Sequence, residues 1–176
     1  MRIGILGSGL MGGKLGTLFA RAGHQVVFSY ARSPQKLKRL AREAGESARA
    51  GAPADAARDA DAVLLAVHWS RADDVLKQAG DLSGKVIVTC SLPMNDDDSA
   101  LVIAHTSSGA EALAEKVPAA RVVGAFGTVP SEVLFGVFEA RRRKTNRPGL
   151  VYYGDDAGAK EVAAGLIRDI GFDPVD

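Results

Sequence analysis

The residues from Gly7 to Gly12 have the types and the spacing that could hold a phosphate group. They read Gly-Ser-Gly-Leu-Met-Gly, a G-x-G-x-x-G turn between an apolar run at 2–6 and an amphipathic stretch at 10–22. In such a turn Gly7 makes the tight bend, Gly9 lets the backbone approach a pyrophosphate, and Gly12 allows the helix to pack on the strand. The free N–H groups at the helix start would face the anion. We therefore predict a dinucleotide site formed by Gly7, Ser8, Gly9, Leu10, Met11 and Gly12.

The residues that end the second predicted strand, 25–29, indicate which dinucleotide is bound. An acidic residue there would hold the ribose hydroxyls of NAD, but the chain reads Ser29-Tyr30-Ala31-Arg32. Arg32 can stack on adenine and fork onto a 2′-phosphate, Ser29 can donate its hydroxyl, and Lys36 lies on the same side of the next helix. Cations at a helix start are also common on solvated surfaces. The missing acid and the two cations together favour NADP(H), held here by Ser29, Tyr30, Arg32 and Lys36.

The nicotinamide of a doubly wound sheet lies over the carboxyl ends of the later strands. Those ends are Ala66 to Trp69, Cys90 to Pro93 and Ala125 to Thr128. His68 could donate a proton there, or it could be a polar residue where a strand leaves the core, and we favour the second interpretation. Cys90 is expected to be a small buried residue. No residue is identified as catalytic.

The sequence lacks the usual motifs for moving protons during alcohol or carbonyl chemistry. It contains no Tyr-x-x-x-Lys pair and no recognisable Ser/His/Asp set. Direct hydride exchange with a second redox ring depends mainly on stacking and orientation, so the absence favours an acceptor that resembles a cofactor. The acidic run 96–98 has no His or Glu at metal-ligand spacing, and no metal site is predicted.

Strand and helix signals alternate in the order expected of a parallel sheet covered by helices on both faces. The fold class predicted is α/β, a single doubly wound Rossmann-type domain over residues 1–176. Ser33-Pro34 and the capping box from Ser108 to Glu111 mark two helix starts. We expect strands at 2–6, 25–29, 47–50, 62–67, 85–90, 121–125 and 150–154, and helices at 10–22, 34–43, 53–59, 70–79, 108–116 and 157–170.

Composition excludes several classes of partner. The chain has 176 residues, 47% of them hydrophobic and 24% charged, with a formal net charge of +1. That balance gives no field for nucleic acid or a membrane surface. The single Cys90 and the lack of a long apolar run lead us to expect a cytoplasmic protein without a membrane span. The basic stretch 140–148 is expected to be a solvated loop rather than an anion site.

Taken together, these motifs resemble one family, the NADP oxidoreductases that use the deazaflavin coenzyme F-420. The similarity runs in order along nearly the whole chain. It is carried by the segments 5–12, 22–27, 29–32, 60–67 with Trp69, 107–111, 121–130, 151–156 and 170–176.

The resemblance implies hydride transfer between NADPH and a deazaflavin ring stacked in a cleft over the strand ends. Members of that family continue into helices that help to close the cleft and often pair subunits, whereas this chain is expected to form the NADP-binding domain over residues 1–176 without those helices, with a homodimer as one option for its assembly. The residues that would border the nicotinamide are Ala66, Val67, His68, Ala125, Phe126 and Gly127. Two alternatives remain open: NADPH-dependent reduction of a flavin, a ferric complex or a small carbonyl compound, and an NADP-binding sensor without catalysis.

Overall fold

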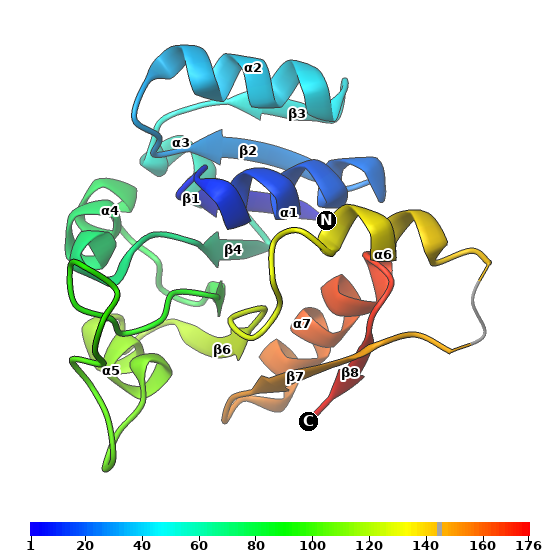
Figure 1. Ribbon diagram of the computed structural model, residues 1–176. Coiled ribbons are helices and arrows are strands. Elements are labelled where there is room, and N and C mark those ends of the chain that lie inside the picture. The colour runs from blue at the N-terminus through cyan, green and yellow to red at the C-terminus, as the bar shows by residue number, and fades with distance from the viewer. Residues whose placement is uncertain (144–145) are drawn as a thin grey trace.

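One sheet forms the centre of the molecule, with helices on both faces (Figure 1). The computed structural model describes residues 1–143 and 146–176. Over these residues the sheet has eight strands in the order β3-β2-β1-β4-β5-β6-β7-β8. Strand β1 therefore lies between β2 and β4, and Ile3 is paired with both Val26 and Ala62. The strand order reverses at β1, and a reversal of this kind is where α/β sheets bind their ligands.

The first half of the chain alternates strictly between strands and helices. All its strand pairs are parallel. Its elements are β1 (Arg2–Leu6), α1 (Leu10–Arg21), β2 (Gln25–Ser29), α2 (Pro34–Ala44), β3 (Ala48–Ala50), α3 (Pro53–Arg58) and β4 (Ala62–Leu65).

The second half extends the sheet from β4 and ends it with two reversed strands, β7 and β8. Strand β7 is antiparallel to β6 and joins it through two residue pairs, Gly124 with Tyr153 and Ala125 with Tyr152. The elements are the 3-10 helix η1 (Trp69–Arg71), α4 (Ala72–Ala79), β5 (Val86–Thr89), α5 (Gly109–Lys116), β6 (Arg121–Ala125), α6 (Leu134–Ala140), β7 (Gly149–Tyr153), α7 (Ala157–Asp169) and β8 (Asp173–Val175).

Two apolar clusters, one on each face, hold the helices to the sheet. On one face Ile5, Leu18 and Phe28 are fully buried with residues of α6 and α7. On the other face Leu65 and Ile87 are buried with residues of α3, α4 and α5. Burial on both faces explains why the central strands read as continuous apolar runs.

The predicted fold class is confirmed, and the predicted strands and helices are found with ends shifted by a few residues. The two predicted helix starts are also present: Ser33 accepts from the Lys36 N–H at 3.3 Å, and Ser108 and Glu111 form a capping box. Two elements were not predicted, α6 and β8, and the helix predicted at 70–79 is divided between η1, which begins at Trp69, and α4. The expected loop 140–148 begins at the last residue of α6, and Lys144 lies outside the described residues. No helix in the described part of the chain is long and apolar enough to cross a membrane.

Candidate functional site

The glycine turn after β1 is built around three glycines with different constraints. Gly7 has a φ of +108°, and a Cβ there would lie 2.5 Å from the carbonyl oxygen of Ala66. A Cβ on Gly12 would lie 1.9 Å from the carbonyl oxygen of Gly7. A Cβ on Gly9 would meet nothing within 4 Å. The protein's own packing therefore requires Gly7 and Gly12, whereas Gly9 leaves open a space outside the backbone.

Hydrogen bonds fix this turn to the end of β2. The N–H groups of Gly7 and Ser8 donate to the carbonyl oxygens of Ser29 and Tyr30 at 3.3 and 3.0 Å. The Ser8 hydroxyl donates to the same Ser29 oxygen at 2.8 Å. These groups are thus used inside the protein and are not free for a ligand.

The N-terminus of α1 is the part of the turn that remains available to an anion. The N–H of Gly13 donates to the carbonyl oxygen of Gly9, and the N–H groups of the preceding helical turn have no intrahelical partner. The first turn of α1 carries no acidic residue. Leu10 is 63% exposed, whereas Met11 packs against the core. The backbone of residues 10–12 can therefore receive a phosphate.

A cavity of about 570 Å³ lies beside this helix start, at the carboxyl ends of β1, β2 and β4. It gathers most of the residues predicted to bind the dinucleotide. Of the residues that the structure describes, three cations and no carboxylate line it. The lining consists of Gly7, Ser8, Gly9, Leu10, Tyr30, Ala31, Arg32, Lys36, Ala66, Val67, His68 and Arg71.

The three cations come from both sides of the glycine turn. Arg32 lies between β2 and α2, Lys36 lies in the first turn of α2, and Arg71 ends η1 after β4. None of the three forms an ion pair with a carboxylate in the described ranges 1–143 and 146–176. Sequence reasoning missed Arg71; the signal for it was its position just after a strand that borders β1.

Ser29 lies elsewhere than expected. Its side chain is fully buried, and its hydroxyl donates to the carbonyl oxygen of Ile5 at 2.7 Å. Ser29 therefore joins β2 to β1 and does not line the cavity, which corrects its expected role at a 2′-phosphate.

The segment after β6 also departs from the expected arrangement. Ala125 and Phe126 are buried, and Phe126 packs edge-on against Phe19 with ring centroids 6.3 Å apart. Gly127 is half-buried, and a Cβ added there would lie 3.3 Å from Cδ2 of Leu92. None of the three lines the cavity, because they come at the end of β6, which β5 separates from β4 in the sheet.

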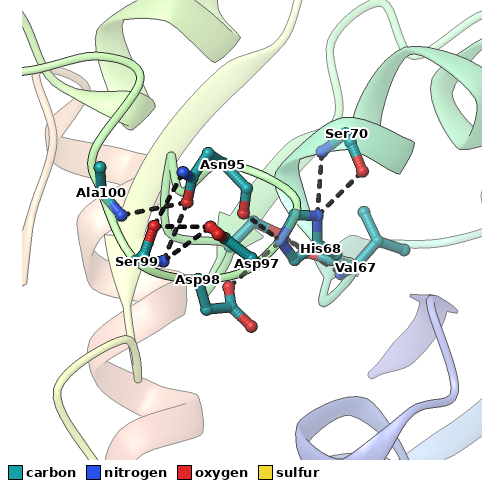
Figure 2. A network of polar contacts seen from close by, with 9 residues as sticks. Val67, His68, Ser70, Asn95, Asp97, Asp98, Ser99 and Ala100 are labelled. Carbon is teal, nitrogen blue, oxygen red and sulfur yellow. Dashed lines mark hydrogen bonds and ion pairs between the residues drawn. The ribbon is translucent and has the colours of Figure 1, made fainter.

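His68 lines the cavity but uses both ring nitrogens within the protein (Figure 2). Nε2 lies 3.1 Å from Oδ1 of Asp98 and 3.1 Å from the carbonyl oxygen of Asn95. Nδ1 contacts Ser70, accepting its N–H at 3.3 Å and lying 2.9 Å from its hydroxyl. A neutral ring with the proton on Nε2 satisfies all of these contacts. His68 therefore ties the end of β4 to the loop after β5, which agrees with the favoured interpretation of a polar structural residue.

The acidic run is part of the same ordered loop (Figure 2). Oδ1 of Asn95 accepts the N–H groups of Ser99 and Ala100. Asp97 accepts the Ser99 hydroxyl at 2.6 Å, and this hydrogen bond lowers the pKa of Asp97. Among the described residues, no group of three or more His, Cys, Asp or Glu side chains could hold a metal ion.

Cys90 directly follows β5. Burial raises the pKa of its thiol to about 12. The thiol lies 3.7 Å from the carbonyl oxygen of Leu65. It is therefore protonated at neutral pH and is not a nucleophile.

A glycine turn at the switch point of a parallel sheet, beside a cationic cavity, is the arrangement of the nicotinamide-dinucleotide oxidoreductases. Comparison with known families gives the same class. The model of the family described as NADP oxidoreductase, coenzyme F420-dependent, matches residues 2–93, and the chain belongs to this family.

Individual relatives fall within oxidoreductases of several kinds. The chain is 31% identical over 175 residues to metalloreductase STEAP3 of Rattus norvegicus; it spans 33% of that protein's length, and the match covers 99% of the chain. A crystal structure of a candidate F420-dependent NADP reductase from Arthrobacter sp. FB24 is 25% identical, with a TM-score of 0.85 over 100% of this chain and 84% of that one.

Two further solved structures extend the comparison. A hypothetical protein from Sinorhizobium meliloti is 28% identical, again with a TM-score of 0.85 over 100% of this chain and 84% of that one. The reductive aminase of Aspergillus terreus, solved with NADPH and ethyl-5-oxohexanoate, is 18% identical with a TM-score of 0.70 over 99% of this chain and 54% of its own. The aminase shares the fold.

Proposed function

We propose that the chain binds NADP(H) in the cavity beside α1 and transfers a hydride between the nicotinamide and a deazaflavin coenzyme of the F-420 type. The observation that carries the proposal is the charge of the cavity: Arg32, Lys36 and Arg71 line it, and no carboxylate does. A dinucleotide with a 2′-phosphate brings one more phosphate than NADH, and a lining of this charge favours the more anionic ligand.

The chain supplies two kinds of phosphate contact. The backbone N–H groups of residues 10–12 lie in the first turn of α1, where they have no partner within the helix and where the helix dipole favours an anion, and they would hold the pyrophosphate. Arg32, just before α2, and Lys36, in the first turn of α2, would hold the 2′-phosphate. Gly9 fits this arrangement because any larger residue would put a Cβ into the open space.

The family description supports a deazaflavin acceptor. When bound, the reduced nicotinamide supplies a hydride. The chain needs only to hold the two rings together and exclude water. Leu10 offers an exposed apolar surface inside the cavity for this purpose, and both ring nitrogens of His68 are already occupied.

Reduction of a ferric complex is the second candidate. It is favoured by the 31% identity to a protein named as a metalloreductase. In that case the nicotinamide site would be unchanged, and only the group that accepts the hydride or electrons would differ.

Calorimetric titration with NADPH and with NADH, followed by stopped-flow assays with coenzyme F-420, flavins and ferric chelates, tests the proposal. We expect NADPH to bind more tightly than NADH and F-420 to be reduced faster than the other acceptors. Selective NADPH binding with ferric reduction alone would favour the second candidate. Selective binding with no turnover on any acceptor would indicate a sensor, and equal or absent binding of the two nucleotides would contradict the NADP site.

A further inference from the structure

The carboxylate of Asp74 is placed where it could compete with a ligand for the guanidinium of Arg71. The two residues are three apart where η1 runs into α4, a spacing at which an arginine and an aspartate commonly pair. They do not pair in the described structure, although Asp74 is close enough for its pKa to be lowered in part by Arg71. The neighbouring Asp73 pairs with Lys116 at 2.7 Å and does not compete.

Tyr30 holds one carboxylate oxygen of Asp74, Oδ2. Its phenolic hydroxyl donates a hydrogen bond to Oδ2 of Asp74, and the side-chain amide of Gln78 donates to the same oxygen at 3.1 Å. This hydrogen bond from Tyr30 is the largest cause of the lowered pKa of Asp74. Tyr30 reaches α4 from the end of β2, where it adopts a left-handed conformation with φ of 54°. That conformation is uncommon for a bulky side chain.

The strand order explains why Arg71 lines the same cavity as Arg32. Arg32 follows β2, Arg71 follows β4, and the Gly7 to Gly12 turn follows β1 between them. Cations thus stand on both sides of the helix start that is available to an anion. The bond from Tyr30 to Asp74 spans the same interval, from the β2 side to the β4 side.

We propose that Arg71 binds a phosphate of the dinucleotide, and that Tyr30 is a positioning residue which holds Asp74 away from Arg71. This inference rests on the proposed dinucleotide site. Without the Tyr30 hydroxyl, Asp74 would be free to pair with Arg71 and to neutralise the guanidinium that the phosphate needs. Tyr30 would then affect ligand affinity through its effect on Asp74.

Four variants form the test, with Kd for NADPH and for NADH measured by calorimetry at fixed ionic strength. Arg71→Met should raise Kd roughly tenfold, as expected for one charge-assisted contact. Tyr30→Phe should raise Kd several-fold. The double variant Tyr30→Phe/Asp74→Asn should return to the wild-type Kd, because an amide cannot neutralise the guanidinium. Tyr30→Phe should add little when Arg71 is already Met, because the two changes act through one contact.

Comparing the change in Kd for NADPH with the change for NADH identifies which phosphate Arg71 binds. A loss confined to NADPH assigns Arg71 to the 2′-phosphate, whereas an equal loss for both nucleotides assigns it to the pyrophosphate. Matched controls are Tyr153→Phe on β7 and Arg42→Met on α2, both exposed and outside the cavity. They should leave both Kd values unchanged, and a thermal melt of each variant checks that it is folded.

Two results would overturn the inference. An unchanged Kd in Arg71→Met would show that Arg71 does not contact a phosphate of the ligand. A loss in Tyr30→Phe that Asp74→Asn does not restore would show that the hydroxyl acts on the ligand directly. The proposed function fails separately, since it requires the wild-type protein to bind NADPH at all.

Discussion

The α-carbon of Gly12 packs so closely against the carbonyl oxygen of Gly7 that a Cβ on Gly12 would lie 1.9 Å from that oxygen. At Gly9, in the same turn, a Cβ would meet no protein atom within 4 Å. Alanine at these two positions should therefore have opposite effects.

We expect Gly12→Ala to lower the free energy of unfolding by at least about 1–3 kcal/mol, the usual cost of overpacking. Gly9→Ala should leave the free energy of unfolding within about 0.5 kcal/mol of wild type while greatly weakening NADPH binding. Urea unfolding and calorimetry on both variants check this. A Gly9→Ala protein that binds NADPH normally would contradict the position of the pyrophosphate.

Arg32→Ala should discriminate between the two nucleotides. The side chain is exposed and has no carboxylate partner in the described part of the chain, so the change should not disturb folding. We expect the Kd for NADPH to rise roughly tenfold while the Kd for NADH changes little, because only NADPH carries the 2′-phosphate. Equal losses would remove Arg32 from that role. Arg42→Met provides the control for a change of net charge.

His68→Gln tests the structural role of the imidazole. Removing a general acid or base costs roughly 100- to 10,000-fold in rate. For His68→Gln we instead expect kcat for reduction of the acceptor to fall by less than about tenfold, since both ring nitrogens of His68 contact the protein. The loop from Ser91 to Ser108 should become more sensitive to limited proteolysis, because its contact with the end of β4 is lost. A rate loss near 1,000-fold without any change in cleavage would identify His68 as catalytic.

The thiol of Cys90 should make stability depend on pH in the alkaline range. Its folded pKa is raised to about 12, so the folded protein keeps the proton after the unfolded chain has lost it. The free energy of unfolding is unaffected below the ordinary thiol pKa of about 8.5, and it should fall by about 2 kcal/mol between there and pH 10. Urea melts of wild type and Cys90→Ala at pH 7 and pH 10 isolate it, because the wild type should lose more stability. Parallel losses would mean that the thiol is not buried in solution.

Local sequence patterns predicted the parts of the site that are local in the chain. The glycine turn and the two helix starts at Ser33 and Ser108 depend on residues a few positions apart, and all three are present. Helix α6 was missed because its seven residues contain Gly136, and β8 because Pro174 is unfavourable in a strand other than one at an edge.

The rest of the site depends on contacts between distant residues. Tyr30 meets Asp74 from 44 positions away, and His68 meets Asp98 from 30. The burial of Ser29 follows from its bond to Ile5 on the neighbouring strand, which no local pattern reveals. Such contacts depend on strand order, and their partners cannot be chosen before that order is known.

Every residue that lines the cavity lies between positions 7 and 71, within the part of the chain that the family model matches. The remaining residues support this half from the side and build the far edge of the sheet. Among the residues after β5, Asn95 and Asp98 contact His68 of the cavity, and substitutions away from these contacts leave the lining itself unchanged. Under the proposed function, the residues that would contact the nucleotide are therefore encoded together in the first 71 positions, apart from the later segments that complete the sheet.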